Sequence, residues 1–433
     1  MSGSSVRPIP VPDGASRTRV RPIAAGSMVA GPVNVLHVLG STSRAGIQVR
    51  TLELLRHVDH RQYRFHFCLL CGRPGELDDE IRALGGRLHP MRVGLPRFPQ
   101  RFCELLRRER VNVVHSHVHY FSGYLLRLAA RCGTPVRVTH FRSSHSDPPP
   151  DPARRLLRAL LRPWVDRYAT EATMRAWLDR YATHILGVSR WALQAAWGPH
   201  WQSDPRCQVV YDGLEPGDFD GAPDGAAVRR EFGLPAEGPL LIHVGRMTEA
   251  KNHVRLISIF AAVLRNLPEA RLLLVGRTSV DPDADVIEKR VRARIAELGI
   301  GPRIVFAGQR SDVPRLIKAA DLLMFPSLYE GLGDVVLEAC AAGTPVLASD
   351  LPSIREIAAQ LPGVRCLSLD EPDSQWAALA EQMTRHRPSD PARRSALESF
   401  ATSPFTVGRC AETLYEIWHG AAARSSGGDV ANG

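Results

Sequence analysis

Short apolar runs recur along the chain between stretches whose apolar residues follow helical spacing. The runs are NVLHVLG (34–40), RFHFCLL, VNVVHSH, VRVTHF and THILGVS in the first half, and GPLLIHVG, ARLLLVG, RIVFAG, DLLMFPS and TPVLAS from about residue 238 onward. Apolar runs of about four to eight residues between polar or glycine-rich segments are typical of strands buried on both faces. Their alternation with helical stretches predicts βαβ units and parallel sheets.

The two series of strands predict two domains, because the segment between them has the composition of a linker. That segment, DGLEPGDFDGAPDG (212–225), is rich in Gly, Pro and Asp. We expect an α/β fold of two doubly wound, Rossmann-like domains that face each other across a cleft, with ligands beyond the carboxyl ends of the strands. The expected segments are a disordered N-terminal stretch (1–32), a first domain (33–210), a linker (211–237), a second domain (238–395), a C-terminal helix packing on the body (396–420) and a disordered tail (421–433).

Composition fits two globular domains and excludes several classes of protein. The chain has 433 residues, of which 44% are hydrophobic, so a disordered or fibrous protein is excluded. No apolar run approaches the ~18 residues of a membrane-spanning helix, and residues 1–30 lack the apolar centre of a signal peptide. We therefore expect a cytoplasmic protein, and the scattered cysteines predict no disulfide framework.

The net charge of +10 is distributed unevenly. Residues 1–200 hold 30 arginines, no lysine and 14 acidic residues, a formal charge of +16, which leaves −6 for the rest. This asymmetry predicts that the first half meets an anionic surface or substrate. Nucleic acid is not expected, because the sequence carries no recognisable zinc-finger, helix-turn-helix or RNA-binding signature.

Basic residues are densest in DPARRLLRALLRPWVDRYATEATMRAWLDRYAT (151–183). Leucines and tryptophans alternate there at roughly helical spacing with Arg154, Arg155, Arg158 and Arg162. This pattern is typical of helices that lie on an anionic membrane, which would place the protein at the inner face of the cell membrane. A solvated helix with a leucine stripe on the core gives the same pattern, so both interpretations stay open.

The stretch HVGRMTEAKNH (243–253) has features of a phosphate-binding loop. Gly245 ends a predicted strand, Arg246 follows directly, and Lys251 comes six residues after Gly245. Two cations and exposed backbone amides at a strand end suit a diphosphate, because a bidentate Arg and the point charge of a Lys neutralise its oxygens. Two solvated surface charges would give the same pattern.

Two glutamates lie where a strand gives way to a helix in FPSLYEGLGDVVLEACAAGTPVLASD (325–350). Glu330 follows the strand, and Gly331 and Gly333 allow the backbone to approach a ligand closely. Glu338 lies in the early turns of the helix, where the helix dipole favours an acid. Its neighbours are apolar, however, so an unpaired carboxylate is costly there, and a carboxylate can accept two hydrogen bonds from a ribose.

Together, GRMTEAKN and EGLGDVVLEA resemble the nucleotide-binding half of the retaining, metal-independent glycosyltransferases of the GT-B fold, family 4, whose mark is a Glu, seven residues and a second Glu. In the first half, NVLHVLGSTSRAG, DDEIRALGGR and VVHSHVHYFSGYLLRLAARCGTPVRVTH resemble the branch that builds capsular and exopolysaccharide repeat units. The resemblance extends from about residue 33 to 420. It implies hexose transfer, without cofactor or metal, from a nucleotide sugar, expected to be a UDP-sugar, to a lipid-linked or growing saccharide.

The resemblance also implies roles for single residues. Arg246 and Lys251 would bind the donor diphosphate, Glu338 the ribose, and Glu330 the hydroxyls of the transferred sugar. His140 of the first domain would face that sugar. The implied catalytic set is Arg246, Lys251, Glu330 and His140, the donor-binding set is Gly245, Arg246, Lys251, Glu330, Gly331, Gly333 and Glu338, and the acceptor or cleft set is Gly46, His117 and His119.

The chain departs from the family pattern in its first loop, where RAGIQ replaces Gly-Gly-x-Glu through Ala45 and Gln48. Asp334 also stands where a hydrophobic residue is common. The residues implied in donor binding remain, so we expect activity. Three other functions stay open, namely transfer to a soluble secondary metabolite, non-catalytic binding of a nucleotide sugar, and epimerisation of one.

The histidines of HSHVH alternate with other residues, which places His115, His117 and His119 on one face if the run is a strand. Three such histidines could mimic a metal cluster. The sequence has no companion carboxylate or cysteine at ligand spacing. A bound metal is therefore not expected. The resemblance implies contact with the acceptor or the cleft, because the family has similar histidines at this strand end.

Overall fold

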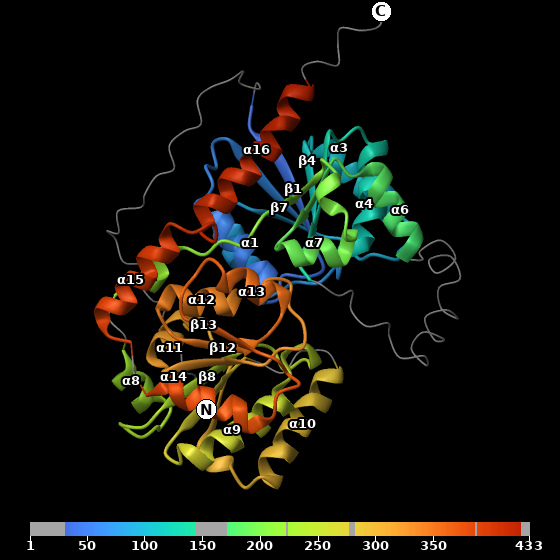
Figure 1. Cartoon of the computed structure of the whole chain (residues 1–433). Coiled ribbons are helices and arrows are strands. Elements are labelled where there is room, and N and C mark those ends of the chain that lie inside the picture. The colour runs from blue at the N-terminus through green and yellow to red at the C-terminus, as the bar shows by residue number, and fades with distance from the viewer. Residues whose placement is uncertain (1–30, 144–170, 222–223, 277–281, 386–387, 426–433) are drawn as a thin grey trace, which may run out of the picture.

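Two parallel sheets form the scaffold of the computed structural model, which describes residues 31–143, 171–221, 224–276, 282–385 and 388–425 (Figure 1). The first sheet has the order β3-β2-β1-β4-β5-β6-β7 and the second the order β10-β9-β8-β11-β12-β13. All neighbouring strands in both are parallel. The predicted α/β fold of two doubly wound domains is confirmed. The four arginines at 154–162 lie outside the described residues.

The first domain carries the following elements: β1 (Val33–Leu39), α1 (Gly46–His57), β2 (Tyr63–Leu69), α2 (Asp78–Ala83), β3 (Arg87–Pro90), α3 (Phe98–Arg108), β4 (Val113–Ser116), η1 (His119–Phe121), α4 (Ser122–Arg131), β5 (Val136–Phe141), α6 (Glu171–Tyr181), β6 (His184–Gly187), α7 (Arg190–Trp197), η2 (Trp201–Ser203) and β7 (Cys207–Val209).

The second half of the chain carries η3 (Pro216–Phe219), α8 (Gly225–Glu231), β8 (Leu240–Val244), η4 (Glu249–Lys251), α9 (His253–Asn266), β9 (Arg271–Val275), α10 (Pro282–Glu297), η5 (Gly301–Arg303), β10 (Ile304–Gly308), α11 (Val313–Ala319), β11 (Leu322–Phe325), α12 (Asp334–Ala342), β12 (Val346–Ser349), α13 (Pro352–Ala358), β13 (Val364–Leu367), α14 (Asp373–Thr384), α15 (Asp390–Ala401) and α16 (Val407–Ser425). In the stretch expected as a linker, η3 and α8 pack on α11 of the second domain.

Strand β1 shows why the apolar runs form strands that are covered on both faces. Leu36 and Val38 belong to one hydrophobic core, and Val33 and Val35 belong to the core on the other side of the sheet. Successive side chains of a strand point to opposite faces, so a strand in mid-sheet needs apolar residues at nearly every position. His37 shares the face of Val35 and is therefore enclosed within the protein.

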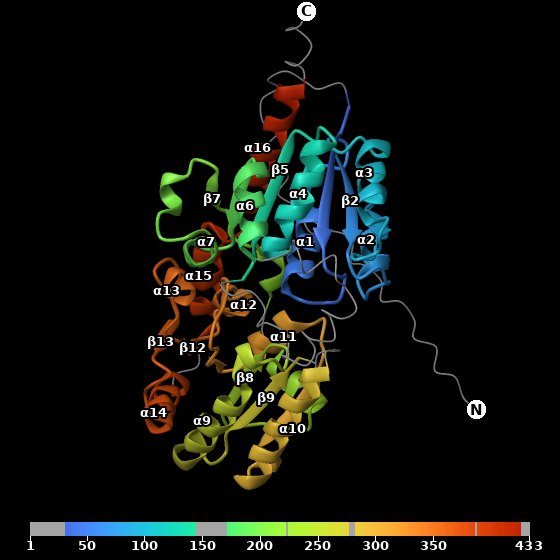
Figure 2. The same ribbon diagram turned by 90° about the vertical axis from the view of Figure 1, so that its right-hand side faces the viewer.

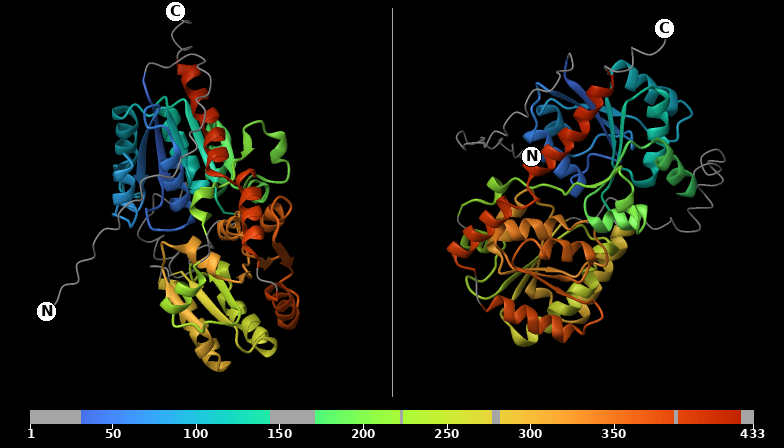
Figure 3. Two further views of the ribbon diagram at one scale, coloured as in Figure 1. Left: turned by 90° about the vertical axis from the view of Figure 1, so that its left-hand side faces the viewer. Right: turned by 45° about the horizontal axis from the view of Figure 1, so that its top comes forward.

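The final helix, α16, returns from the second domain and packs on the first (Figure 3). Trp418 is fully buried, with its ring centroid 5.6 Å from that of Tyr63 and 5.7 Å from that of Phe65. Cys410 and Leu414 join the same core. The last helix of the chain thus completes the core of the first domain.

In the described residues the chain crosses between the domains twice, and the two crossings lie side by side. The Leu214 N–H donates to Phe405 O at 3.0 Å, and the Val407 N–H donates to Leu214 O at 2.9 Å. Glycine is required at position 213, because a Cβ there would lie 2.5 Å from the nitrogen of Val407. Viewed from the side, one domain lies above the other with α16 running along the upper one (Figure 2).

Two expectations about the chain as a whole are tested by the described residues. All eight cysteines lie in described segments and are free, which confirms that they form no disulfide framework. Among the helices that the structure describes, none combines the length and the apolar character needed to cross a membrane.

Candidate active site

The loop between β11 and α12 brings the second domain against the first. Gly333 adopts a φ of +104°, which favours glycine, and a Cβ there would lie 2.7 Å from Ile354 Cδ1. Gly331 lies directly against the backbone carbonyl of Arg142, so it has no room for a side chain. Its own carbonyl accepts a hydrogen bond from Ser189 Oγ at 2.5 Å. The glycines therefore serve close contact between the domains as well as the turn into α12.

Lys251 and Glu330 meet at the carboxyl ends of β8 and β11. The distance from Lys251 Nζ to Glu330 Oε1 is 2.6 Å, and both side chains are mostly buried. The ammonium also lies 4.7 Å from the ring centroid of Phe325, where the π face attracts a cation. Gly245 allows this arrangement, because a Cβ there would lie 3.2 Å from the side-chain carbons of Lys251. Arg246, next in the chain, is exposed.

Glu338 is buried in α12 and pairs with Arg50 from α1 of the first domain. The distance from Arg50 Nη2 to Glu338 Oε1 is 2.8 Å. Burial raises the pKa of Glu338 to about 7, although the guanidinium of Arg50 opposes this rise. The second oxygen, Oε2, is buried and has no hydrogen-bond partner among the described residues.

Arg50 is surrounded by further acids. Its Nη1 lies 2.8 Å from Glu53 Oε2, and its Nε lies 3.9 Å from Asp334 Oδ2. The start of α1 contacts the start of α12 as well, because a Cβ on Gly46 would lie 3.0 Å from Asp334 Oδ2. Asp334, which departs from the family pattern, thus lies at the boundary between the domains.

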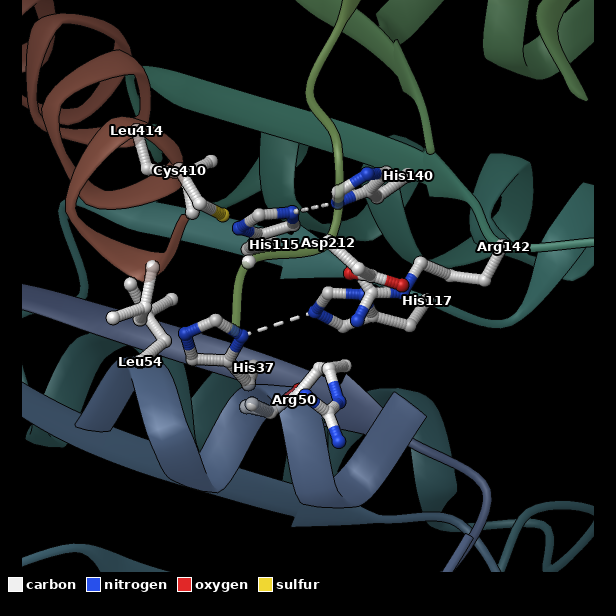
Figure 4. Close-up of a pocket in the computed structure, with 13 residues that line it drawn as sticks. His37, Arg50, Leu54, His115, His117, His140, Arg142, Asp212, Cys410 and Leu414 are labelled. Atoms are coloured by element: carbon white, nitrogen blue, oxygen red, sulfur yellow. Dashed lines mark hydrogen bonds and ion pairs between the residues drawn. The ribbon is translucent and has the colours of Figure 1, made fainter. Parts of the chain in front are cut away.

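Four histidines gather beside this boundary, at the carboxyl ends of β1, β4 and β5 (Figure 4). His37 Nδ1 lies 3.0 Å from His117 Nε2, and His115 Nε2 lies 3.2 Å from His140 Nδ1. Burial lowers the pKa of His37 to about 3 and the pKa values of the other three well below the usual value. All four rings are therefore neutral at neutral pH.

The histidines line a small cavity between α1 and α16. Its volume is about 20 Å³, the space that one water molecule needs. Four ring nitrogens there have no hydrogen-bond partner among the described residues, namely His37 Nε2, His115 Nδ1, His117 Nδ1 and His140 Nε2. Ring nitrogens of His37, His115 and His117 lie within 4.8 Å of one another, so these three residues could hold a metal ion. A second such group in the described part of the chain is His66, His89 and Glu109.

His119 lies apart from this cluster. Strand β4 ends at Ser116, and His119 begins η1 with a φ of +48°, so it does not share a strand face with His115 and His117. Its ring packs edge-on against Phe141, at 5.2 Å between centroids. The structure brings together only two of the three histidines of HSHVH and adds His37 and His140 to them.

Four charged or polar residues at the site had no role in the sequence prediction, namely His37, Arg50, Arg142 and Asp212. Arg142 Nη1 lies 2.5 Å from Asp212 Oδ1, and burial raises the pKa of Asp212 to about 7. Arg50 is one of several polar residues in GIQVRTLELL, whereas one signal was available for His37, which interrupts an otherwise apolar run in NVLHVLG. Such a residue is buried and needs a partner, which the sequence does not name.

Comparison with known proteins shows what the chain is similar to. Residues 225–394 match the family described as glycosyl transferases group 1, and residues 45–198 match a glycosyl transferase 4-like domain. The putative glycosyltransferase EpsF of Bacillus subtilis is 30% identical over 352 residues, covering 79% of this chain and 85% of EpsF. CapH of Staphylococcus aureus, a capsular polysaccharide biosynthesis glycosyltransferase, is 24% identical over 327 residues, covering 75% of this chain and 83% of CapH.

A solved structure shares the two-domain arrangement. HepE of Anabaena, crystallised with UDP and glucose, superposes with a TM-score of 0.71 at 17% identity. The match covers 89% of this chain and 99% of HepE. At 17% identity, this structural similarity shows that the two proteins share the GT-B fold.

Proposed function

Because the chain belongs to the group 1 glycosyl transferases and is a glycosyltransferase of polysaccharide biosynthesis, we propose that it transfers a hexose from a UDP-sugar to a lipid-linked or growing saccharide, with retention at the anomeric carbon. The observation that carries this proposal is the pair of Lys251 and Glu330, joined at 2.6 Å where β8 and β11 end. A cation and an acid held there suit a diphosphate and a sugar hydroxyl, respectively.

In the proposed mechanism, the bond between the anomeric carbon and the diphosphate breaks while the acceptor hydroxyl attacks from the same face. The acceptor's proton passes to the leaving phosphate oxygen. Lys251 and Arg246 stabilise the negative charge that builds on the diphosphate, more in the transition state than in the bound donor. Glu330 accepts a hydrogen bond from the sugar, and Glu338 from the ribose. The reaction so written uses no metal, cofactor or protein nucleophile.

The donor is tested by thermal unfolding of the purified protein with UDP, GDP or ADP. A nucleotide at 100 times its dissociation constant stabilises the protein by about 2.7 kcal/mol. We expect a rise in Tm with UDP alone, its loss in Lys251→Ala and its retention in Lys289→Ala, which removes an exposed lysine of α10. Turnover of UDP-hexoses by the wild type then identifies the sugar. Absence of both a Tm rise and turnover would contradict the proposal.

A lipid-linked acceptor would bring the basic first domain to the cytoplasmic face of a membrane. Residues 1–200 carry a formal charge of +16. Cosedimentation with vesicles of anionic lipid is expected at low salt and is expected to fall at about 0.5 M salt, where surface charges are screened. Vesicles of zwitterionic lipid are the control. If the protein binds neither kind of vesicle, a soluble acceptor is favoured.

A further inference from the structure

Arg50 belongs to the first domain, but its partners lie on both sides of the domain boundary. It contacts Glu53 on its own helix and Glu338 and Asp334 on α12. The exposed fraction of its side chain is only 8%. A guanidinium with so little access to water requires acidic partners, and the buried carboxylates require a cation in turn.

The two oxygens of Glu338 have different surroundings. Oε1 accepts a hydrogen bond from Arg50 Nη2 at 2.8 Å, whereas Oε2 is buried and has no partner among the described residues. A carboxylate held at one oxygen cannot rotate freely, so the direction of the other oxygen is fixed. A buried acceptor of this kind is costly unless a ligand donates to it.

We propose that Arg50 is a positioning residue for nucleotide binding, which fixes Glu338 through Oε1 so that Oε2 faces the ribose hydroxyls of the donor. This inference rests on the proposed function, because it takes Glu338 as the ribose-binding acid. It assigns the first domain a part in donor affinity that the implied donor-binding residues, all in the second domain, do not include. Donor binding and the contact between the domains are then linked through one side chain.

The ion pair between Arg50 and Glu338 also affects the pKa of Glu338. Arg50 and Glu53 face it from α1, Asp334 from α12 and Lys251 from η4. Burial and the two acids raise the pKa of Glu338, while Arg50 and Lys251 oppose the rise. Loss of Arg50 therefore raises the pKa further, and a larger fraction of Glu338 becomes protonated at neutral pH.

The test compares Arg50→Met with Arg50→Lys, measuring UDP affinity by calorimetry and donor KM and kcat from pH 6 to 9. We expect Arg50→Met to weaken UDP binding and raise KM about tenfold at pH 7, with a smaller effect on kcat. The defect should shrink as the pH rises, and Arg50→Lys should recover part of the affinity. Arg56→Met is the matched control, since Arg56 is exposed on the same helix and pairs with Glu80.

A structural role alone would give a different result. If Arg50→Met lowered Tm but left KM and its pH dependence as in the wild type, the proposal would be wrong. The same holds if Arg50→Met still raised KM on a Glu338→Gln background. Where Arg50→Met does not fold, Arg50→Lys carries the test, and a wild-type KM at every pH would overturn the proposal. Failure of the proposed function is distinguishable, because the wild type itself would then neither bind UDP nor turn over a donor.

Discussion

Lys251 and Glu330 are 79 residues apart in the chain and form an ion pair of 2.6 Å. The pair exists because β8 and β11 are neighbours in a parallel sheet, so their carboxyl ends meet at one edge. Its members are expected to act on different parts of the donor. Lys251 is expected to bind the diphosphate, which UDP contains, and Glu330 the transferred hexose, which UDP lacks.

Glu330→Gln should therefore separate sugar recognition from nucleotide binding. We expect it to lower kcat with the UDP-sugar by about 10²-fold while UDP affinity stays within about threefold of wild type. Lys251→Ala should lower both. Calorimetry with UDP and steady-state kinetics with the UDP-sugar give the two quantities. Equal losses of UDP affinity in the two variants would contradict the division of roles.

Glu338 should make the protein sensitive to the ribose hydroxyls. Wild type is expected to bind UDP about tenfold more tightly than 2′-deoxy-UDP, because a buried acceptor that loses its donor is costly. Glu338→Gln should remove most of that preference. The measurement is the ratio of the two dissociation constants. Glu398→Gln, at an exposed glutamate of α15, should leave the ratio unchanged.

The buried histidines should make the protein sensitive to acid. The pKa of His37 falls from 6.5 to about 3 on burial, so below pH 6.5 the unfolded chain binds a proton that the folded chain does not. Stability is then lost as the pH falls, by about 2 kcal/mol at pH 5 for such a group. Glu338 and Asp212 act in the opposite sense, since their raised pKa values make the folded chain bind more protons between about pH 4 and 7.

His37→Gln isolates the histidine contribution. We expect the fall in unfolding free energy between pH 7 and pH 5 to be about 2 kcal/mol smaller in His37→Gln than in wild type. Urea unfolding at the two pH values measures it. His60→Gln removes an exposed histidine and should leave the fall unchanged. An unaltered fall in His37→Gln would show that the ring is not kept neutral.

The close contact between the two segments that cross between the domains predicts that Gly213→Ala destabilises the protein. Gly213→Ala places a methyl group 2.5 Å from the nitrogen of Val407, so one of the two backbone segments must shift to accept it. We expect a loss of about 1–3 kcal/mol in unfolding free energy. Gly217→Ala is the control, because a Cβ there meets only the Glu215 side chain at 3.7 Å. Similar Tm values for the two variants would show that the crossings can shift.

The three strands that the apolar pattern did not predict all lie at the edge of a sheet. β3, β7 and β13 each lie at an edge of a sheet, and their segments RLHP, CQV and VRCL contain no long apolar run. An edge strand is covered less completely than a central one, so apolar residues are not needed at every position. The central strands, buried on both faces, were all visible as apolar runs.

The site could be predicted only as far as its residues lie at strand ends within one domain. Lys251 and Glu330 stand at strand ends of one domain, which the apolar pattern locates. The pairing of Arg50 with Glu338 depends on how two domains meet, and the distance of 288 residues between them carries no periodic signal. The cluster of His37 with His117 depends likewise on the order of strands in the sheet.

The position of α16 sets the order in which the protein can mature. Tyr63 and Phe65 belong to the first domain, yet their ring contacts with Trp418 form only after residues 66–417, the second domain included, have been synthesised. During translation, the apolar surface of the first domain that α16 covers therefore stays exposed while the second domain is synthesised. Closing that face brings α16 against α1, β1 and β5 of the first domain, so a ribosome that stalls before residue 418 leaves the second domain complete and the first without part of its core.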